Sequence, residues 1–168
     1  MTRPDPAPHL AAVAAAQAAP GQPAALFAAL YAAMGEALGH ILFTILVIHP
    51  GAGESQRCYS NMPQAYPVGG RKPIARTPWF RSVLDEGVPY IGRSYEDIRE
   101  VFFDHELIRS LGCESVLNVP VRWNGRSLGT LNLLHRAGWY EEADIPAARL
   151  FAALAVPGLL AAIAAPTA

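Results

Sequence analysis

Cysteine is scarce in this sequence, which contains only Cys58 and Cys113 among 168 residues. Two cysteines can form at most one bridge, and this excludes the disulfide framework of a small secreted domain. We therefore expect both thiols to be small apolar residues, half-buried in the strands of a reduced cytoplasmic protein.

Charged residues are also scarce, and neither sign prevails. They make up 16% of the chain, and the formal net charge is −1. Binding to nucleic acid or to an anionic membrane surface requires a basic patch. The arginines between residues 71 and 99 are interleaved with aspartate and glutamate. We therefore expect neither a nucleic-acid partner nor a membrane partner.

Long apolar runs are absent as well. The run over residues 150–165 is short for a membrane span and is interrupted by Pro157 and Gly158. At the other end, Arg3 precedes an alanine-rich run over residues 10–19. The prolines between them, and the weak hydrophobicity of alanine, argue against a signal peptide.

The length and composition of the chain fit one folded domain. A chain of 168 residues can bury a sizeable core, and 52% of its residues are hydrophobic, which argues against disorder. A proline- and glycine-containing break lies at residues 20–23. We therefore expect a flexible, alanine-rich leader over residues 1–20 and a single domain over residues 21–165.

The order of predicted elements mixes helices and strands. Periodicity and end signals predict a helix that ends near Gly39, strands at 41–48 and 54–60, and then a long irregular loop. A helix from Thr77 to Glu86, a short strand at 88–91, a helix that starts at the capping residue Ser94 and a further turn near Asp104 should follow. The chain should end with a hairpin over 115–134 and a last helix from about Glu142, which Pro157 should kink or end.

The hairpin carries the sharpest local signal. Asn124-Gly125 between two apolar runs favours a two-residue turn, because both positions tolerate positive φ. A turn closed by the flanking residues pairs Leu117 with Asn132 and Val119 with Thr130. The face predicted from this register carries Ser115, Leu117, Thr130 and Asn132, and Asn118 lies on the other face. A bulge at Pro120 would shift the assignment.

The stretch from Leu111 to Val121, continued through residues 124–133, resembles the late-strand signature of GAF domains. Its most specific part is the spacing of Ser115, Pro120, Gly125 and Gly129, and the resemblance covers roughly residues 23–164. It implies an α+β fold, GAF-like or profilin-like. In this fold a central antiparallel sheet carries the terminal helices on one face and lid loops with short helices on the other.

The resemblance also implies a function. GAF domains bind cyclic nucleotides, tetrapyrroles, amino acids or other small molecules, often as homodimers through their terminal helices. We therefore expect a cytoplasmic sensory or regulatory domain that binds an unidentified small-molecule ligand, acts without a fused output domain and forms a homodimer. The sequence indicates no particular cofactor.

The candidate ligand-binding residues fall into two groups. An aromatic lid would be formed by Tyr66, Trp79, Tyr90, Phe103 and His105, and a partly polar floor by Ser115, Leu117, Thr130 and Asn132. The alternative for the aromatic residues is a small core between lid and sheet, and for the polar residues it is bonding to neighbouring backbone. If the floor binds ligand, Asn132→Leu keeps the fold and abolishes binding.

Other chemistries have weaker signals. Arg71, Lys72 and Arg76 would attract an anionic ligand or remain solvated. The histidines and cysteines lack the close spacing of a zinc motif. A GAF-fold enzyme of the free methionine sulfoxide reductase type is the alternative function, but its cysteine cluster is missing here. The cysteine–histidine context of a pigment-binding photosensor is missing too.

Overall fold

The computed structural model describes residues 1–166, and a six-stranded sheet forms its centre. The strands are β1 (Leu42–His49), β2 (Glu54–Ser60), β3 (Gly69–Pro73), β4 (Tyr90–Gly92), β5 (Ser115–Trp123) and β6 (Arg126–His135). Their order is β3-β2-β1-β6-β5-β4, and every neighbouring pair is antiparallel. The predicted α+β class with a central antiparallel sheet is confirmed.

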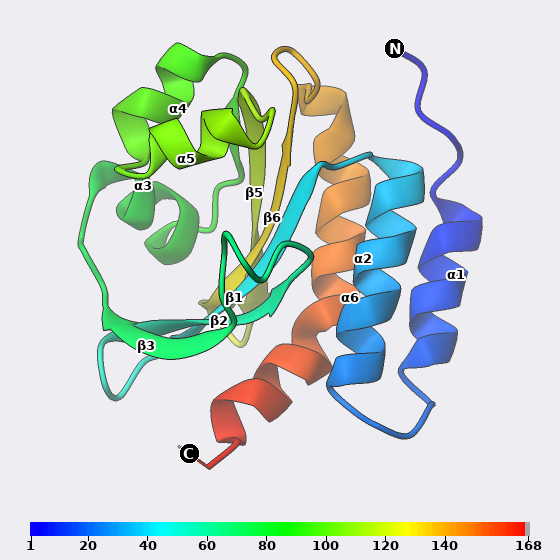
Figure 1. Cartoon of the computed structure of the whole chain (residues 1–168). Coiled ribbons are helices and arrows are strands. Elements are labelled where there is room, and N and C mark those ends of the chain that lie inside the picture. The colour runs from blue at the N-terminus through cyan, green and yellow to red at the C-terminus, as the bar shows by residue number, and fades with distance from the viewer. Residues whose placement is uncertain (167–168) are drawn as a thin grey trace.

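Helices cover both faces of this sheet (Figure 1). The helical elements are α1 (Ala7–Ala16), α2 (Ala24–Ala37), α3 (Pro78–Phe80) with a π-helical turn (Arg81–Asp85), α4 (Tyr95–Val101), α5 (His105–Ser110), a 3-10 turn (Glu142–Asp144) and α6 (Ile145–Ala164). The terminal helices lie on one side of the sheet, and the short helices α3, α4 and α5 lie on the other. This is the predicted arrangement.

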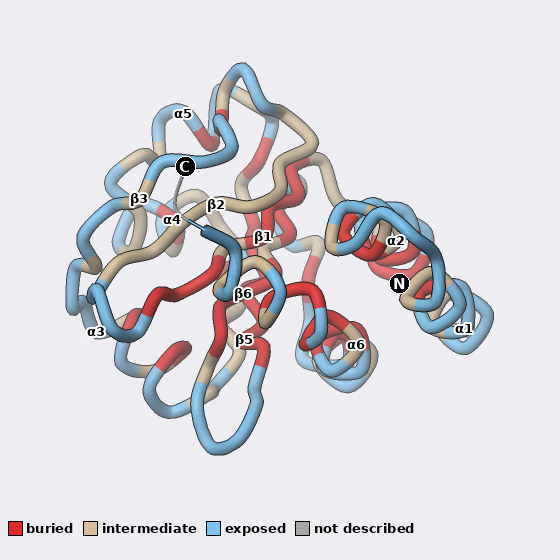
Figure 2. Tube along the Cα trace, turned by 90° about the horizontal axis from the view of Figure 1, so that it is seen from below, coloured by how far each residue is buried: buried red, intermediate tan, exposed pale blue. Residues whose placement is uncertain are grey.

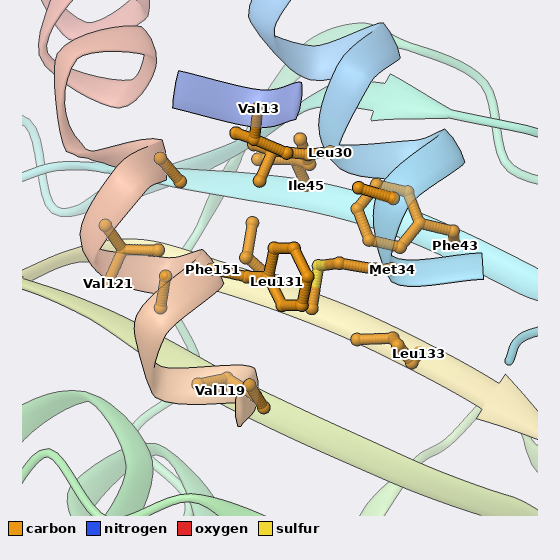
Figure 3. Close-up of a cluster of buried hydrophobic side chains, with 14 of the residues drawn as sticks. Val13, Leu30, Met34, Phe43, Ile45, Val119, Val121, Leu131, Leu133 and Phe151 are labelled. Atoms are coloured by element: carbon orange, nitrogen blue, oxygen red, sulfur yellow. The ribbon is translucent and has the colours of Figure 1, made fainter. Parts of the chain in front are cut away.

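The main core lies between the sheet and the terminal helices. Figure 3 shows Phe43 and Ile45 of β1 facing Leu30 and Met34 of α2, while Phe151 of α6 lies over the strands. All five of these side chains are fully buried. Alternate residues of each strand point to this core, which leaves the residues between them for the opposite face. The same strands therefore contact the helices on one side and the lid on the other.

The N-terminal residues pack onto this helical layer. The α1 helix lies against α2 and α6 (Figure 2), and its Val13 is fully buried. Arg3 donates to both carboxylate oxygens of the buried Asp144 at 2.8 and 3.0 Å, and to the Trp139 carbonyl. The residues expected to form a flexible leader thus contribute a helix and an ion pair to the fold.

The lid elements follow the predicted end signals closely. The Thr77 hydroxyl accepts from the Phe80 N–H at the start of α3, and Ser94 and Asp97 form a capping box at α4. Two details differ. The helix from Thr77 turns π-helical at Arg81, and the predicted irregular loop contains β3, which pairs with β2 through a register shift.

The predicted hairpin register is wrong by one residue. Asn124 and Gly125 form the turn with φ values of 50° and 77°, but the pairing slips between Val121 and Arg122. Because of this bulge, Leu117 pairs with Leu133, and Asn118 pairs with Asn132. The break lies past Pro120, nearer the turn, so it changes the register of the entire buried part of the hairpin.

The last helix is long and apolar enough, by length and composition alone, to cross a membrane. In this fold it is a core helix, because Phe151, Ala155 and Leu159 are fully buried against the sheet and α2. The helix continues through Pro157 to Ala164. Its axis changes direction in the second half (Figure 1), which agrees with the kink predicted for this proline.

Candidate functional site

A cavity of about 460 Å³ lies between the sheet and the lid. Its floor comes from β1, β5 and β6, one side comes from β2 and β3, and its roof comes from the loop before β3 and the helices α3 and α5 with their flanking residues. The lining includes Leu42, Thr44, Leu46, Arg57, Tyr66, Lys72, Trp79, Phe102, Phe103, Asp104, Leu107, Ile108, Val116, Asn118, Thr130, Asn132 and Leu134.

The floor consists of three rows of residues that run across neighbouring strands. Strand pairing places Arg57, Leu46 and Thr130 side by side in a first row, the arginine row. The asparagine row, two residues further along the strands, contains Thr44, Asn132 and Asn118. The aliphatic row, two residues further again, contains Leu42, Leu134 and Val116. Polarity therefore falls along the strands, from the arginine row to the aliphatic row.

The asparagine row is a continuous chain of hydrogen bonds. The Trp79 indole N–H donates to Asn118 Oδ1 at 3.0 Å, and Asn118 Nδ2 donates to Asn132 Oδ1 at 2.8 Å. Asn132 Nδ2 in turn donates to the Thr44 hydroxyl at 3.2 Å. This chain fixes the orientation of both amides and ties the lid residue Trp79 to the floor. A buried network of this kind is stable only when its members find partners.

Thr130 in the arginine row is the exception to this satisfied floor. Its side chain is fully buried, and its hydroxyl has no hydrogen-bond partner among the residues that the structure describes. An unsatisfied buried hydroxyl costs about 1–3 kcal/mol. A ligand in the cavity can offset this cost by bonding to the hydroxyl. Because the hydroxyl is covered in this fold, a bound molecule reaches it only if the lining side chains around it move aside.

We expect Thr130→Val to stabilise the ligand-free protein by about 1 kcal/mol while it weakens ligand binding. Valine has nearly the shape of threonine and removes only the unpartnered hydroxyl. Urea unfolding of ligand-free protein measures the first effect, and calorimetric titration measures the second. A destabilised variant would show that the hydroxyl already has a partner within the fold.

The roof contains a second polar group and several aromatic rings. The Tyr66 hydroxyl donates to the Asp104 carboxylate at 2.6 Å, and burial is the main reason that the pKa of Tyr66 is raised. The Arg57 guanidinium lies 4.9 Å from the centre of the Tyr66 ring. Trp79 and Phe102 meet edge to face at 5.9 Å. These contacts hold the roof over the rows of the floor.

Apolar side chains also line the edge of the cavity. Phe103 is 95% exposed, although it is a large hydrophobic residue, and Leu107 is partly exposed as well.

Five of the nine residues predicted to contact ligand line the cavity. The list is Tyr66, Trp79, Phe103, Thr130 and Asn132. The other four do not line it. Tyr90 packs against Phe102 behind the roof, and His105 bonds to the Tyr95 hydroxyl at 2.7 Å. Because of the bulge, Ser115 and Leu117 lie on the face of β5 that points towards the helices. The Ser115 hydroxyl donates to the backbone carbonyl of Arg136.

The sequence interpretation missed Asn118, Thr44 and Arg57. The predicted hairpin register, which is wrong by one residue, placed Asn118 on the face away from the predicted ligand-binding residues. An asparagine inside an otherwise apolar strand was nevertheless a signal that could have identified it. Thr44 lies in the predicted strand at 41–48, which is apolar at nearly every position, so nothing singled out its hydroxyl. In the sequence, Arg57 was recognisable only as a charged residue in the predicted strand at 54–60. Of the basic loop residues, Lys72 lines the cavity, while Arg71 and Arg76 pair with Glu54 and Asp85.

The cysteines and histidines have other surroundings. Cys58 packs with the helix-side core and Cys113 with a cluster under α5, and neither lines the cavity. His49 bonds to Gln56, and His135 stacks on Trp139 at 3.6 Å. Within residues 1–166, no three His, Cys, Asp or Glu side chains form a group that could hold a metal ion.

Both thiols should react slowly in the folded protein. Burial raises the pKa of Cys58 from 9.0 to about 12 and that of Cys113 to about 11. Only the thiolate is nucleophilic. We therefore expect alkylation by iodoacetamide at pH 8 to be at least about a hundredfold slower in the folded protein than in urea. A folded-state rate equal to the rate in urea would contradict these environments.

Comparison with known proteins gives one family and many structures. The family model of the GAF domain matches residues 9–156. No protein of curated function matches the sequence significantly. Three solved structures illustrate the structural similarity.

The GAF domain of a phosphoenolpyruvate-protein phosphotransferase from Coxiella burnetii is 16% identical, with a TM-score of 0.72 over 94% of each chain. A phycocyanobilin-bound GAF domain from a cyanobacterial phytochrome is 18% identical, with a TM-score of 0.68 over 97% of this chain and 96% of that chain. A substrate complex of the free methionine-R-sulfoxide reductase from Neisseria meningitidis is 15% identical, with a TM-score of 0.61 over 96% and 93%. At these identities the similarity establishes the fold and nothing further.

Proposed function

This chain belongs to the GAF domain family, and from this premise we propose that it is a regulatory domain that binds a small organic molecule in the cavity between sheet and lid. The observation that carries the proposal is the cavity of about 460 Å³ itself, whose lining combines the fixed amides of the asparagine row, Thr130 and apolar side chains. Cavities of about 300–1,000 Å³ with apolar walls and a few fixed polar groups are typical of small-molecule sites. A hydroxyl without a partner is explained if a bound molecule supplies one.

The strands offer a route from the cavity to the helices. Thr44 and Leu46 line the cavity, while Phe43 and Ile45, which alternate with them on β1, pack under α2. A ligand that shifts this strand therefore shifts both layers, because a packed core does not deform continuously. We propose that the terminal helices pass the change on to a partner.

We also propose that the protein is a cytoplasmic homodimer joined through its terminal helices. Leu150 of α6 and Tyr31 of α2 are exposed apolar side chains on this helical layer, and its alanines allow another helix to approach closely. The free thiols Cys58 and Cys113 suit a reducing compartment. Light scattering during size-exclusion chromatography tests the subunit number, and Leu150→Glu should shift a dimer towards monomer.

Thiol-based sulfoxide reduction is not supported by the site. Such chemistry needs an attacking thiolate beside the substrate and a second thiol to resolve the product. Cys58 and Cys113 do not line the cavity, and burial keeps both protonated. We therefore propose that the cavity binds a small molecule without reducing a sulfoxide.

Native mass spectrometry tests the proposed function. Protein purified without denaturation is weighed under native conditions and again after unfolding, and the difference gives the mass of any retained molecule. We expect either a retained organic molecule or, for protein emptied during purification, thermal stabilisation by compounds from a metabolite library. A bare mass together with no stabilising compound would contradict the proposal.

A further inference from the structure

The charges around the cavity are unequally paired. Arg57 on β2 and Lys72 on β3 both line it, and neither takes part in an ion pair between described residues. Asp104 is the acidic residue of the lining, and its carboxylate accepts the Tyr66 hydroxyl. The cavity therefore has an excess of positive charge on the side formed by β2 and β3.

Arg57 has the stronger need for an anion. The structure gives its side chain one hydrogen bond, from Nη1 to the Pro67 carbonyl at 3.0 Å. Burial lowers the pKa of this guanidinium, because the charged form has lost water without gaining a carboxylate in contact, and Tyr66 and the more distant Asp104 offset the effect only in part. A guanidinium carries five N–H donors in a fixed fork that fits a carboxylate or a similar oxyanion.

The position of Arg57 sets the direction of the ligand. Leu46 pairs with both Arg57 and Thr130, so the cation and the unpartnered hydroxyl lie two strands apart in the arginine row. This corresponds to about 10 Å between their backbones. The asparagine row follows along the strands, and the aliphatic row lies at the far end, beneath Ile108. The aliphatic row packs with Ile108 in a buried cluster, so the cavity has a cationic end, a hydrogen-bonding centre and an accessible apolar lining of Leu46, Trp79 and Phe102.

We propose that the ligand is an amphipathic organic anion. Its carboxylate or other oxyanion binds Arg57 with Lys72, a polar group near the centre bonds to the half-exposed Asn132 amide, and its apolar part lies against the half-exposed Leu46, Trp79 and Phe102. This inference rests on the proposed function, because it concerns the molecule bound in the same cavity. It excludes cations and uncharged polar molecules as preferred ligands.

Two dyes of matched shape test the charge requirement. Anilinonaphthalene sulfonate carries a sulfonate on an aromatic body, and N-phenyl-1-naphthylamine has the same body without the charge. Fluorescence titration gives the Kd of each dye for the unmodified protein and for Arg57→Met/Lys72→Met. The control is Arg71→Met, which removes one positive charge from the residue next to Lys72 on β3, outside the lining.

We expect the double variant to raise the Kd of the sulfonate dye at least about tenfold and that of the neutral dye less than about twofold. The control variant should bind both dyes as the unmodified protein does. If the double variant does not fold, Lys72→Met alone, at an exposed position, and the salt dependence of the unmodified protein replace it. Salt should weaken only the sulfonate dye.

The other outcomes distinguish a failure of the charge requirement from a failure of the proposed function. Equal binding of both dyes, unchanged in the double variant and insensitive to salt, overturns the charge requirement and leaves the proposed function intact. An equal loss of both dyes in the double variant also overturns it, because the residues then act through shape. Failure of both dyes to bind the unmodified protein counts against the cavity as a receptor for organic molecules, and the charge requirement falls with it.

Discussion

Gly129→Ala is expected to destabilise the protein by about 4 kcal/mol or more, an effect at the extreme end for a single substitution. Gly129 lies in β6 between Val47 of β1 and Val121 of β5. A Cβ at this position would lie 1.8 Å from the Leu46 carbonyl oxygen. The obstacle is backbone, which cannot rotate away, so β1 and β6 would have to separate at the centre of the sheet.

Urea unfolding followed by circular dichroism measures this effect, with Gly51→Ala as its matched control. A Cβ on Gly51 meets no atom within 4 Å, and its backbone does not need a positive φ. The control should stay within about 0.5 kcal/mol of the unmodified protein. If the stability of Gly129→Ala is also within about 0.5 kcal/mol of the unmodified protein, then β1 and β6 do not approach each other as described, and the rows of the floor are misplaced.

Asn132→Leu is expected to abolish ligand binding while the protein remains folded. Asn132 is the centre of the asparagine row, where it accepts from Asn118 and donates to Thr44. Leucine removes both bonds and takes one partner from each of two polar groups, Asn118 Nδ2 and the Thr44 hydroxyl, at a cost of about 1–3 kcal/mol per group. It also replaces the hydrogen-bonding centre of the floor with a bulky apolar group. Calorimetric titration of the sulfonate dye measures the loss.

Leu133→Met is the matched control for this variant. Leu133 is the next residue of β6, but it points into the helix-side core. A volume-conserving change there costs less than about 1.5 kcal/mol. The control should therefore lose some stability and bind the dye normally. Normal binding by Asn132→Leu would mean that the asparagine row supports the fold and does not contact the ligand.

Local signals in the sequence predicted most of the fold. Thr77 and Ser94 start their helices because their hydroxyls satisfy free N–H groups, and this chemistry is readable without coordinates. The Asn124-Gly125 turn was readable for the same reason. By contrast, β3 pairs with β2 through long-range contacts, and its residues include two glycines and a proline, which carry no strand signal of their own.

The site was less predictable because it depends on register. A bulge between Val121 and Arg122 moves every buried residue of β5 by one position relative to β6. That slip turns Ser115 and Leu117 towards the helices and brings Asn118 into the cavity. Pro120 signalled a possible bulge in β5, but no residue type marks the actual break between Val121 and Arg122. The aromatic residues of the lid were identifiable as a group, but their order over the cavity was not.

Methyl NMR of the protein with the sulfonate dye tests the central claim most directly, since it shows where a ligand lies. We expect dye contacts and large shift changes at the methyl groups of Leu46 and Leu107, which are accessible in the lining, and smaller shift changes at the buried aliphatic row, Leu42, Leu134 and Val116. Leu30 and Leu131 on the helix side should change little. Dye contacts confined to the helical face, with the aliphatic row unperturbed, would contradict a ligand site between the sheet and the lid.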